Sequence, residues 1–305
     1  MHAQESHPVK SAVSALLIAI AVVAVLTPLV RLLAFRLGAV AHPGGRHIHK
    51  RSIPRLGGLA IMAAFFTPIL VLMRLDPIIA EIMQKEAWRF VGVLGGGLAM
   101  CAVGVVDDTR GIRAIYKLFA QIIAALFAFR CGFAIHNVYV PFVGDLSMGA
   151  FAAPVTVLWI VGVVNAVNLI DGLDGLAAGV VFFAAITNLL VAWIGGSLFI
   201  ALLSAATAGA VLGFLFYNFN PARIFMGDSG SYFLGFVLAV TSLLSQKAST
   251  TVSLLAPVVA LGVPIIDTLF AWCVASWSDG RSSRRTGGTS TTGCSTWASR
   301  TGARC

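Results

Sequence analysis

The sequence predicts an all-α, polytopic membrane protein with about nine transmembrane helices. Its 305 residues are 58% hydrophobic and only 11% charged, whereas a soluble domain carries about 25% charged residues. The mean hydropathy is +0.92. Apolar runs close to the length of about 20 residues that crosses a bilayer follow one another with short breaks. These three observations favour a multi-pass protein over a soluble domain.

The first predicted span covers residues 11–34, an apolar run that is too long for the core of a cleavable signal. The remaining spans are predicted at 57–74, 88–106, 114–131, 151–167, 174–194, 197–217, 230–246 and 252–275. The glycines at 95–97 fall inside a span and indicate close helix packing. Residues 133–148 alternate in polarity and contain Gly144, so a short hairpin outside the membrane is expected there.

Basic residues cluster in the loops that follow the odd-numbered spans. The formal charge is +9, but these residues lie in short loops between apolar runs, so no nucleic-acid partner is expected. Positive charge favours the cytoplasmic side of a membrane, which places these loops inside and the N-terminus outside. The five cysteines form no Cys-x-x-Cys pair, so neither a disulfide framework nor a zinc site is indicated.

Two adjacent acids, Asp107 and Asp108, end the span predicted at 88–106. Such a pair is costly at a membrane boundary unless it binds a cation or a proton. Mg²⁺ prefers oxygen ligands together with substrate phosphates, and one acid could instead act as a base. A solvated acid pair is the alternative. Lys117 follows nearby, with Gln121 one turn later, and could pair with an acid, bind phosphate or extend to the membrane surface.

A second polar segment joins two predicted helices and holds Asn165, Asn168, Asp171 and Asp174. Its spacing does not match a calcium-binding EF-hand loop. A helix start capped by Asp174 would explain part of the pattern. It does not explain two amides and two carboxylates within ten residues, which favours a binding or catalytic role.

Two further loops fall on the same predicted face. Asp228 stands at the start of a predicted helix, where free N–H groups could bind a phosphate. Phe225 could stack on a base, although packing is the more usual role of such an aromatic. The basic loop at 44–58, which includes His49 and Arg55, suits phosphate charge when it lies beside acidic loops.

Together these segments resemble the polyprenyl-phosphate N-acetylhexosamine-1-phosphate transferases of glycosyltransferase family 4. The resemblance runs from about residue 30 to residue 275 and rests on G-x-x-D-D, N-x-x-N-x-x-D-G-x-D-G-L and P-A-x-x-F-M-G-D-x-G-S in that order. It implies ten or eleven helices with catalytic loops on the cytoplasmic face. It also implies transfer of N-acetylglucosamine-1-phosphate from UDP-N-acetylglucosamine to undecaprenyl phosphate, releasing UMP, as the first membrane step of cell-envelope polysaccharide synthesis.

The resemblance implies a role for each polar side chain. The metal ligands would be Asp228 and Asn168, holding Mg²⁺ or Mn²⁺. The catalytic groups would act on the lipid phosphate, the diphosphate and the nucleotide pocket, and are Asp107, Asp108, Lys117, Asp171 and Asp174. The substrate-binding residues would be His49, Arg55, Asn165 and Phe225, the last stacking on uracil. Ala41 stands where an acid is expected, so nucleotide contacts in that loop remain open.

The resemblance further implies a bacterial inner-membrane enzyme whose partners are undecaprenyl phosphate, a UDP-N-acetylhexosamine, membrane lipid and, as an open alternative, a second copy of the chain. Two other functions compete. One is the related transferase that forms lipid I from a muramoyl-pentapeptide donor. The other is a secondary transporter, which should carry its polar residues near mid-membrane, whereas here they lie at the ends of predicted spans.

Residues 278–305 differ from the predicted transmembrane domain at 1–277. They are rich in Ser, Thr, Gly and Arg, a composition typical of a disordered tail. The resemblance instead implies a histidine-rich loop and further helices. Codons chosen for the residues from Arg285 to Cys294, read two bases later, spell Asp-Arg-Gly-His-Ile-His-His-Arg-Leu. This sequence matches the expected loop, so we infer a frameshift in the gene or in its sequencing.

We predict that the 305-residue chain is nearly inactive and that restoring the reading frame before Thr286 rescues sugar-phosphate transfer. Each missing charge-assisted phosphate contact would contribute about 1.5–3 kcal/mol, so losing several should lower the rate by orders of magnitude. Transfer of radiolabelled sugar to lipid would be compared between the two chains. Robust activity of the chain as written, or a well-expressed repaired chain without activity, would contradict the frameshift.

Overall fold

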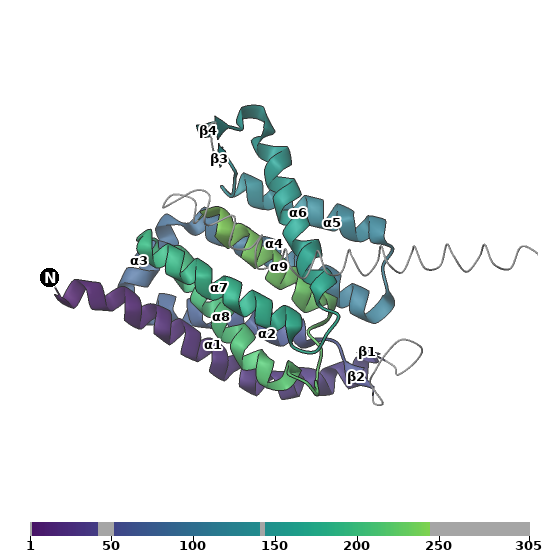
Figure 1. The fold of residues 1–305 in the computed structure, drawn as a ribbon. Coiled ribbons are helices and arrows are strands. Elements are labelled where there is room, and N and C mark those ends of the chain that lie inside the picture. Colours follow the sequence, from purple (N-terminus) through teal and green to yellow (C-terminus); the bar gives the residue numbers. More distant parts are fainter. Residues whose placement is uncertain (1, 42–51, 141–143, 245–305) are drawn as a thin grey trace, which may run out of the picture. The chain divides into compact units, whose positions relative to one another are not determined.

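The structure, a computed structural model, describes residues 2–41, 52–140 and 144–244 and is all-α apart from two short strand pairs (Figure 1). Its helices are α1 (His2–Leu37), α2 (Gly57–Leu75), α3 (Pro77–Lys85), α4 (Ala87–Arg110), α5 (Ala114–Arg130), α6 (Ala152–Ile170), α7 (Leu176–Ile194), α8 (Leu198–Asn218) and α9 (Gly227–Leu244). A single 3₁₀ turn, Gly149–Phe151, precedes α6.

The first eight predicted spans each correspond to a helix, which confirms the polytopic all-α fold. Seven of the described helices are long and apolar enough to cross a membrane. The predicted span at 114–131 became α5, which has 17 residues and therefore stands at the lower limit of about 17–25 residues for a span. The predicted span at 252–275, His49 and the tail at 278–305 lie outside the described residues.

Helix α3 was not predicted, because the segment between α2 and α4 was expected to be a loop. The Asp76 carboxylate accepts a hydrogen bond of 3.0 Å from the Ile78 N–H, and Pro77 occupies the first helical position, where its fixed φ is favourable. Ile79 and Met83, four residues apart, are buried on one face. A cap, a proline and this spacing are sufficient to begin a short helix.

The predicted hairpin is confirmed. Strands β3 (Asn137–Val140) and β4 (Gly144–Ser147) pair antiparallel, with Asn137 opposite Ser147. A second pair, β1 (Val40–Ala41) and β2 (Ile53–Pro54), was not predicted. It closes the base of the first basic loop, and the Arg55 N–H donates to the Ala39 carbonyl at 3.0 Å. The chain is thereby fixed on both sides of residues 42–51.

Helix α9 is the most enclosed element of the described bundle. It contacts α2, α4, α6, α7 and α8, and Figure 1 shows it alongside α4. Every residue from Ser229 to Leu243 is buried. By contrast, α1 packs on α2 and α8 and leaves Leu17, Val25 and Leu32 exposed, as expected for a helix whose outer face meets lipid. The start of α9 is therefore held inside the bundle.

Glycines permit this enclosure. A Cβ atom at Gly58 of α2 would clash with the backbone of Gly230, and one at Gly104 of α4 would clash with the backbone of Ser229. One at Gly96 would clash with the Phe236 ring, which confirms the close packing predicted for residues 95–97. Contacts at 104 with 229 and at 96 with 236 show that α4 and α9 run antiparallel. The end of α4 therefore meets the start of α9.

We predict that Gly104→Ala lowers the free energy of unfolding by about 1–3 kcal/mol, because the new methyl group must displace the α9 backbone. Gly162→Ala is the matched control, since a Cβ at this glycine of α6 would meet nothing within 4 Å. Alanine is favoured over glycine in a helix by up to about 1 kcal/mol, so the control should be neutral or slightly stabilised. Thermal unfolding in detergent would measure both, and equal melting temperatures would refute this account of the packing.

Candidate active site

Polar side chains from four helices meet at one end of the described bundle. Asp107 and Asp108 lie in the last turn of α4, and Lys117 lies in the first turn of α5. Asn168 lies in the last turn of α6, and Asp228 follows Gly227 at the start of α9. The antiparallel packing of α4 and α9 brings their acids together although about 120 residues separate them in the chain. The structure thus joins three of the polar segments singled out in the sequence.

Lys117 lies between two carboxylates. Its Nζ forms an ion pair with Asp107 Oδ2 and lies 3.5 Å from Asp228 Oδ2. Asp107 Oδ1 accepts a hydrogen bond of 2.9 Å from the Ile112 N–H, and Asp228 Oδ1 accepts one of 2.9 Å from Asn168 Nδ2. Each carboxylate is therefore held by one oxygen and directs the other toward a shared cation.

Asp108 has a different position from its neighbour. Its Oδ1 accepts the Asp228 N–H at 3.0 Å, and its Oδ2 accepts the Ser229 N–H at 3.1 Å. A carboxylate on the first N–H groups of a helix is stabilised by hydrogen bonding and by the helix dipole. We expected these N–H groups to be free for a phosphate, and that expectation is wrong for these two. In this arrangement Asp108 fixes the helix start that carries Asp228.

Asn165 links two helices. Its Nδ2 donates to Gln121 Oε1 at 2.7 Å, and Gln121 is buried one turn after Lys117 on α5. The contact therefore joins α5 to α6 beside the carboxylate pair. It supports the placement of Lys117, while the predicted contact of Asn165 with substrate stays a prediction.

The turn between α6 and α7 is tied to the loop at 219–226. Asp174 Oδ2 accepts the Ala222 N–H at 3.1 Å, and Asn218 Oδ1 accepts the Gly175 N–H at 3.1 Å. The N-cap of α7 is Gly175, in a left-handed conformation and without a side-chain cap, so the expectation that Asp174 caps this helix is wrong. Asp174 instead connects two of the predicted motifs.

Asp171 follows α6 and belongs to the same electrostatic environment. Burial, followed by the negative charges of Asp228 and Asp108, raises the pKa of its carboxyl to about 8. The charge of Arg55 opposes this shift. This arrangement favours the neutral form of Asp171, and positive charge brought to the site would favour its ionised form.

Phe225, in the loop before α9, pairs through its backbone with the end of β2 and the start of α2. Its N–H donates to the Pro54 carbonyl at 2.8 Å, and its carbonyl accepts the Gly57 N–H at 3.0 Å. The Phe225 side chain is half-buried. This backbone pairing brings Phe225 beside the segment that contains Arg55. Stacking of Phe225 on uracil stays a prediction.

The donor set fits a divalent cation that also binds substrate. Within the described ranges, no three His, Cys, Asp or Glu side chains form a cluster that could hold a metal on their own. Mg²⁺, however, is commonly held by one or two carboxylates plus phosphates and water. Asp107 and Asp228 already converge on a positive group, the Lys117 ammonium. Asn168 presents its nitrogen to Asp228, so a role as ligand requires its amide to turn over.

Tyr232 was not predicted to belong to the site. Its hydroxyl lies 3.3 Å from Asp107 Oδ2 and 3.4 Å from Asp228 Oδ2, and the residue is only 2% exposed. The available signal was its position four residues after Asp228 in a predicted helix, which places both side chains on one face.

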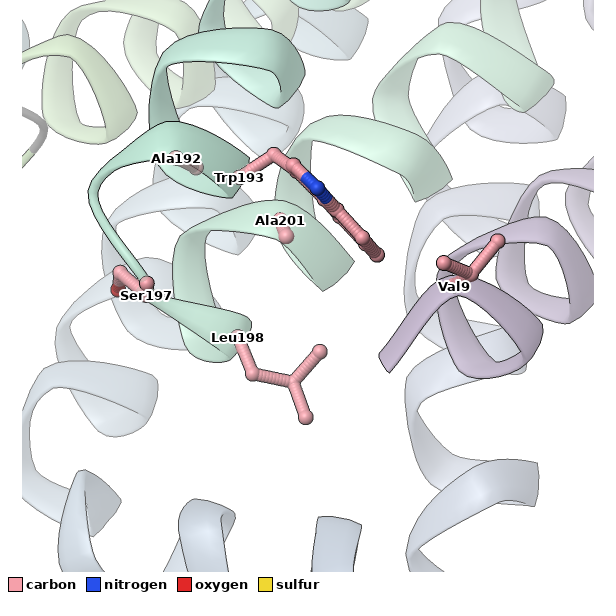
Figure 2. A pocket seen from close by; sticks show the side chains of 7 residues that line it. Val9, Ala192, Trp193, Ser197, Leu198 and Ala201 are labelled. Atoms are coloured by element: carbon pink, nitrogen blue, oxygen red, sulfur yellow. The ribbon is translucent and has the colours of Figure 1, made fainter. Parts of the chain in front are cut away.

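A separate cavity of about 640 Å³ lies between the start of α1, the end of α7 and the start of α8 (Figure 2). Its described lining residues are uncharged: Val9, Ala192, Trp193, Gly196, Ser197, Leu198 and Ala201. Trp193 stands at the opposite end of α7 from Asp174. This cavity is therefore distinct from the carboxylate site.

Comparison with known proteins gives consistent matches. The model of glycosyl transferase family 4 matches residues 90–246, which include α4 to α9. A probable undecaprenyl-phosphate N-acetylglucosaminyl 1-phosphate transferase of Bacillus subtilis is 40% identical over 261 residues, covering 85% of this chain and 70% of that protein. A decaprenyl-phosphate N-acetylglucosaminephosphotransferase of Mycolicibacterium smegmatis is 36% identical over 265 residues, covering 79% of this chain and 65% of that protein.

A more distant relative is the phospho-N-acetylmuramoyl-pentapeptide-transferase of Levilactobacillus brevis, which is 35% identical over 212 residues and covers 65% of this chain and 63% of that protein. The chain thus spans about two thirds of the length of these relatives. The matches disfavour a transporter, because the family and these relatives are transferases. The matched region contains Asp107, Lys117, Asn168 and Asp228, and the chain belongs to glycosyl transferase family 4.

Proposed function

We propose that this chain transfers N-acetylglucosamine-1-phosphate from UDP-N-acetylglucosamine to undecaprenyl phosphate, giving the lipid-pyrophosphoryl sugar and UMP. The observation that carries the proposal is the convergence of Asp107 and Asp228 on the Lys117 ammonium at helix ends. The names of the bacillary and mycobacterial relatives support the sugar and the polyprenyl-phosphate acceptor. The match to the muramoyl-pentapeptide enzyme covers less of the chain, so a lipid I-forming activity is disfavoured.

The reaction joins two anions. An oxygen of the lipid phosphate attacks the phosphorus that bears the sugar, and the bond from that phosphorus to the bridging oxygen breaks as UMP leaves. Charge neutralisation and in-line positioning provide most of the rate enhancement in such transfers. Lys117 would neutralise phosphate charge, and Asp107 would orient the lipid phosphate and accept its proton. Asp108 would act indirectly, by fixing the start of α9.

Asp228, with Asn168, would hold Mg²⁺, for which Mn²⁺ could substitute. When bound, the metal supplies positive charge to the diphosphate. The nucleotide would lie on the side of the site formed by the first loop and the turns around α7. We assign this side to Asp171, Asp174, Arg55 and Phe225, whereas the substrate contacts of Asn165 and of His49, which lies outside the described residues, stay predictions.

We predict that Asp228→Asn lowers the rate of UMP release at least about a hundredfold, a loss typical of removing one preorganised electrostatic contact. The variant would be made in the chain with its reading frame restored and assayed with UDP-N-acetylglucosamine, undecaprenyl phosphate and Mg²⁺. Glu81→Gln is the control, because this exposed acid pairs with Lys85 on α3, far from the site. Turnover of Asp228→Asn close to that of the control would remove Asp228 from the mechanism.

We also propose that the site faces the cytoplasm of a bacterial inner membrane and that the N-terminus lies outside, on the basis of loop charge. Single cysteines would be placed at 46–50 and at 195–197 of a cysteine-free chain. An impermeant thiol reagent added to intact cells should label only the 195–197 site, and membrane disruption should expose the other. Labelling of both sites in intact cells would refute this topology.

A further inference from the structure

Tyr232 lies where the two carboxylates of the site approach each other. It follows Asp228 by one turn of α9, and its hydroxyl is within 3.4 Å of the Oδ2 atoms of both Asp228 and Asp107. The Oδ1 atoms of the two acids are bonded elsewhere, to the Ile112 N–H and to Asn168. The hydroxyl of Tyr232 therefore meets the two oxygens that remain for a ligand.

Lys117 contacts these same two oxygens, but its side chain can move more freely than that of Tyr232. The lysine side chain is 25% exposed and has a flexible four-carbon stem. Tyr232 is only 2% exposed and belongs to the most enclosed helix. The ammonium can withdraw when another cation arrives, whereas the phenol stays in place.

The single proton of the Tyr232 hydroxyl limits how many hydrogen bonds it can donate. A tyrosine hydroxyl has one proton and donates to one acceptor at a time. It can therefore hold either Oδ2 atom while the second faces the cation. A carboxylate held in this way keeps its orientation without a second positive charge that would compete with a metal.

We propose that Tyr232 is a positioning residue: its hydroxyl holds the facing oxygen of one of the two acids, Asp107 or Asp228, while the facing oxygen of the other is left for one divalent cation. This inference rests on the proposed function, because it assumes that the site binds such a cation. Partners that orient metal ligands are commonly worth 10–100-fold in metal affinity. Loss of the hydroxyl would remove the neutral donor that these two oxygens share.

The test is Mn²⁺ binding by the full chain in detergent, followed by the electron paramagnetic resonance signal of free Mn²⁺. Tyr232→Phe keeps the ring and removes only the hydroxyl, and we expect its dissociation constant for Mn²⁺ to rise about tenfold. Tyr217→Phe is the matched control, because the Tyr217 hydroxyl donates to the Ala24 carbonyl at 3.0 Å and joins α8 to α1. Its dissociation constant should stay within about twofold of the wild type.

Asp228→Asn identifies the site, since it should remove the Mn²⁺ binding that Tyr232→Phe weakens. Unchanged Mn²⁺ affinity in Tyr232→Phe, an equal loss in both phenylalanine variants, or binding that Asp228→Asn leaves intact would each overturn the inference. Mn²⁺ binding that follows the expected pattern supports it even if the repaired chain transfers no sugar phosphate. That combination would count against the proposed function and not against the positioning role of Tyr232.

Discussion

The site depends on one capping interaction, the carboxylate of Asp108 on the first N–H groups of α9. This contact joins the end of α4 to the start of α9 at the point where glycines let the backbones touch. Asp228 belongs to the capped turn, so its position follows from the cap. Asp107, next to Asp108 in the chain, is brought opposite Asp228 by the same contact. The two adjacent acids thus have different partners, since Asp108 caps the start of α9 and Asp107 faces Lys117.

Such an arrangement concentrates negative charge in a poorly solvated place. Carboxylates near a membrane are costly unless they are paired, and Asp107 and Asp228 each have partners on two sides. Asp107 and Asp228 share Lys117 and Tyr232, while each uses its other oxygen for a neutral donor. Asp171 has less compensation, and burial, followed by the charges of Asp228 and Asp108, raises its pKa. A cationic metal and its phosphate ligands would change this balance, which suits a site that assembles with its substrates.

Much of this could be predicted from the sequence. The spans followed from long apolar runs, and the polar segments stood out because grouped carboxylates are costly at a membrane boundary unless they bind a cation or a proton. The division of labour between Asp107 and Asp108 could not be predicted, because it depends on which oxygen faces which helix. Tyr232 was missed, because the position of its hydroxyl between two acids from different helices follows from the packing of α4 on α9. Helix α3 was missed because it is too short to give a span signal, although Asp76 and Pro77 marked its start.

The position of the polar residues along the helices helps to distinguish a transferase from a transporter. In the described helices the middle of the bundle contains small neutral groups, such as the buried Thr207 of α8, whose hydroxyl donates to the Leu203 carbonyl. The acids of the site instead occupy the last turn of α4 and the first turn of α9. A transporter needs ionisable groups along a path near mid-membrane. A transferase that joins a lipid phosphate to a soluble nucleotide sugar needs them where both substrates can arrive together, which is at the end of the helices. The location of the carboxylates therefore argues for surface chemistry independently of the family match.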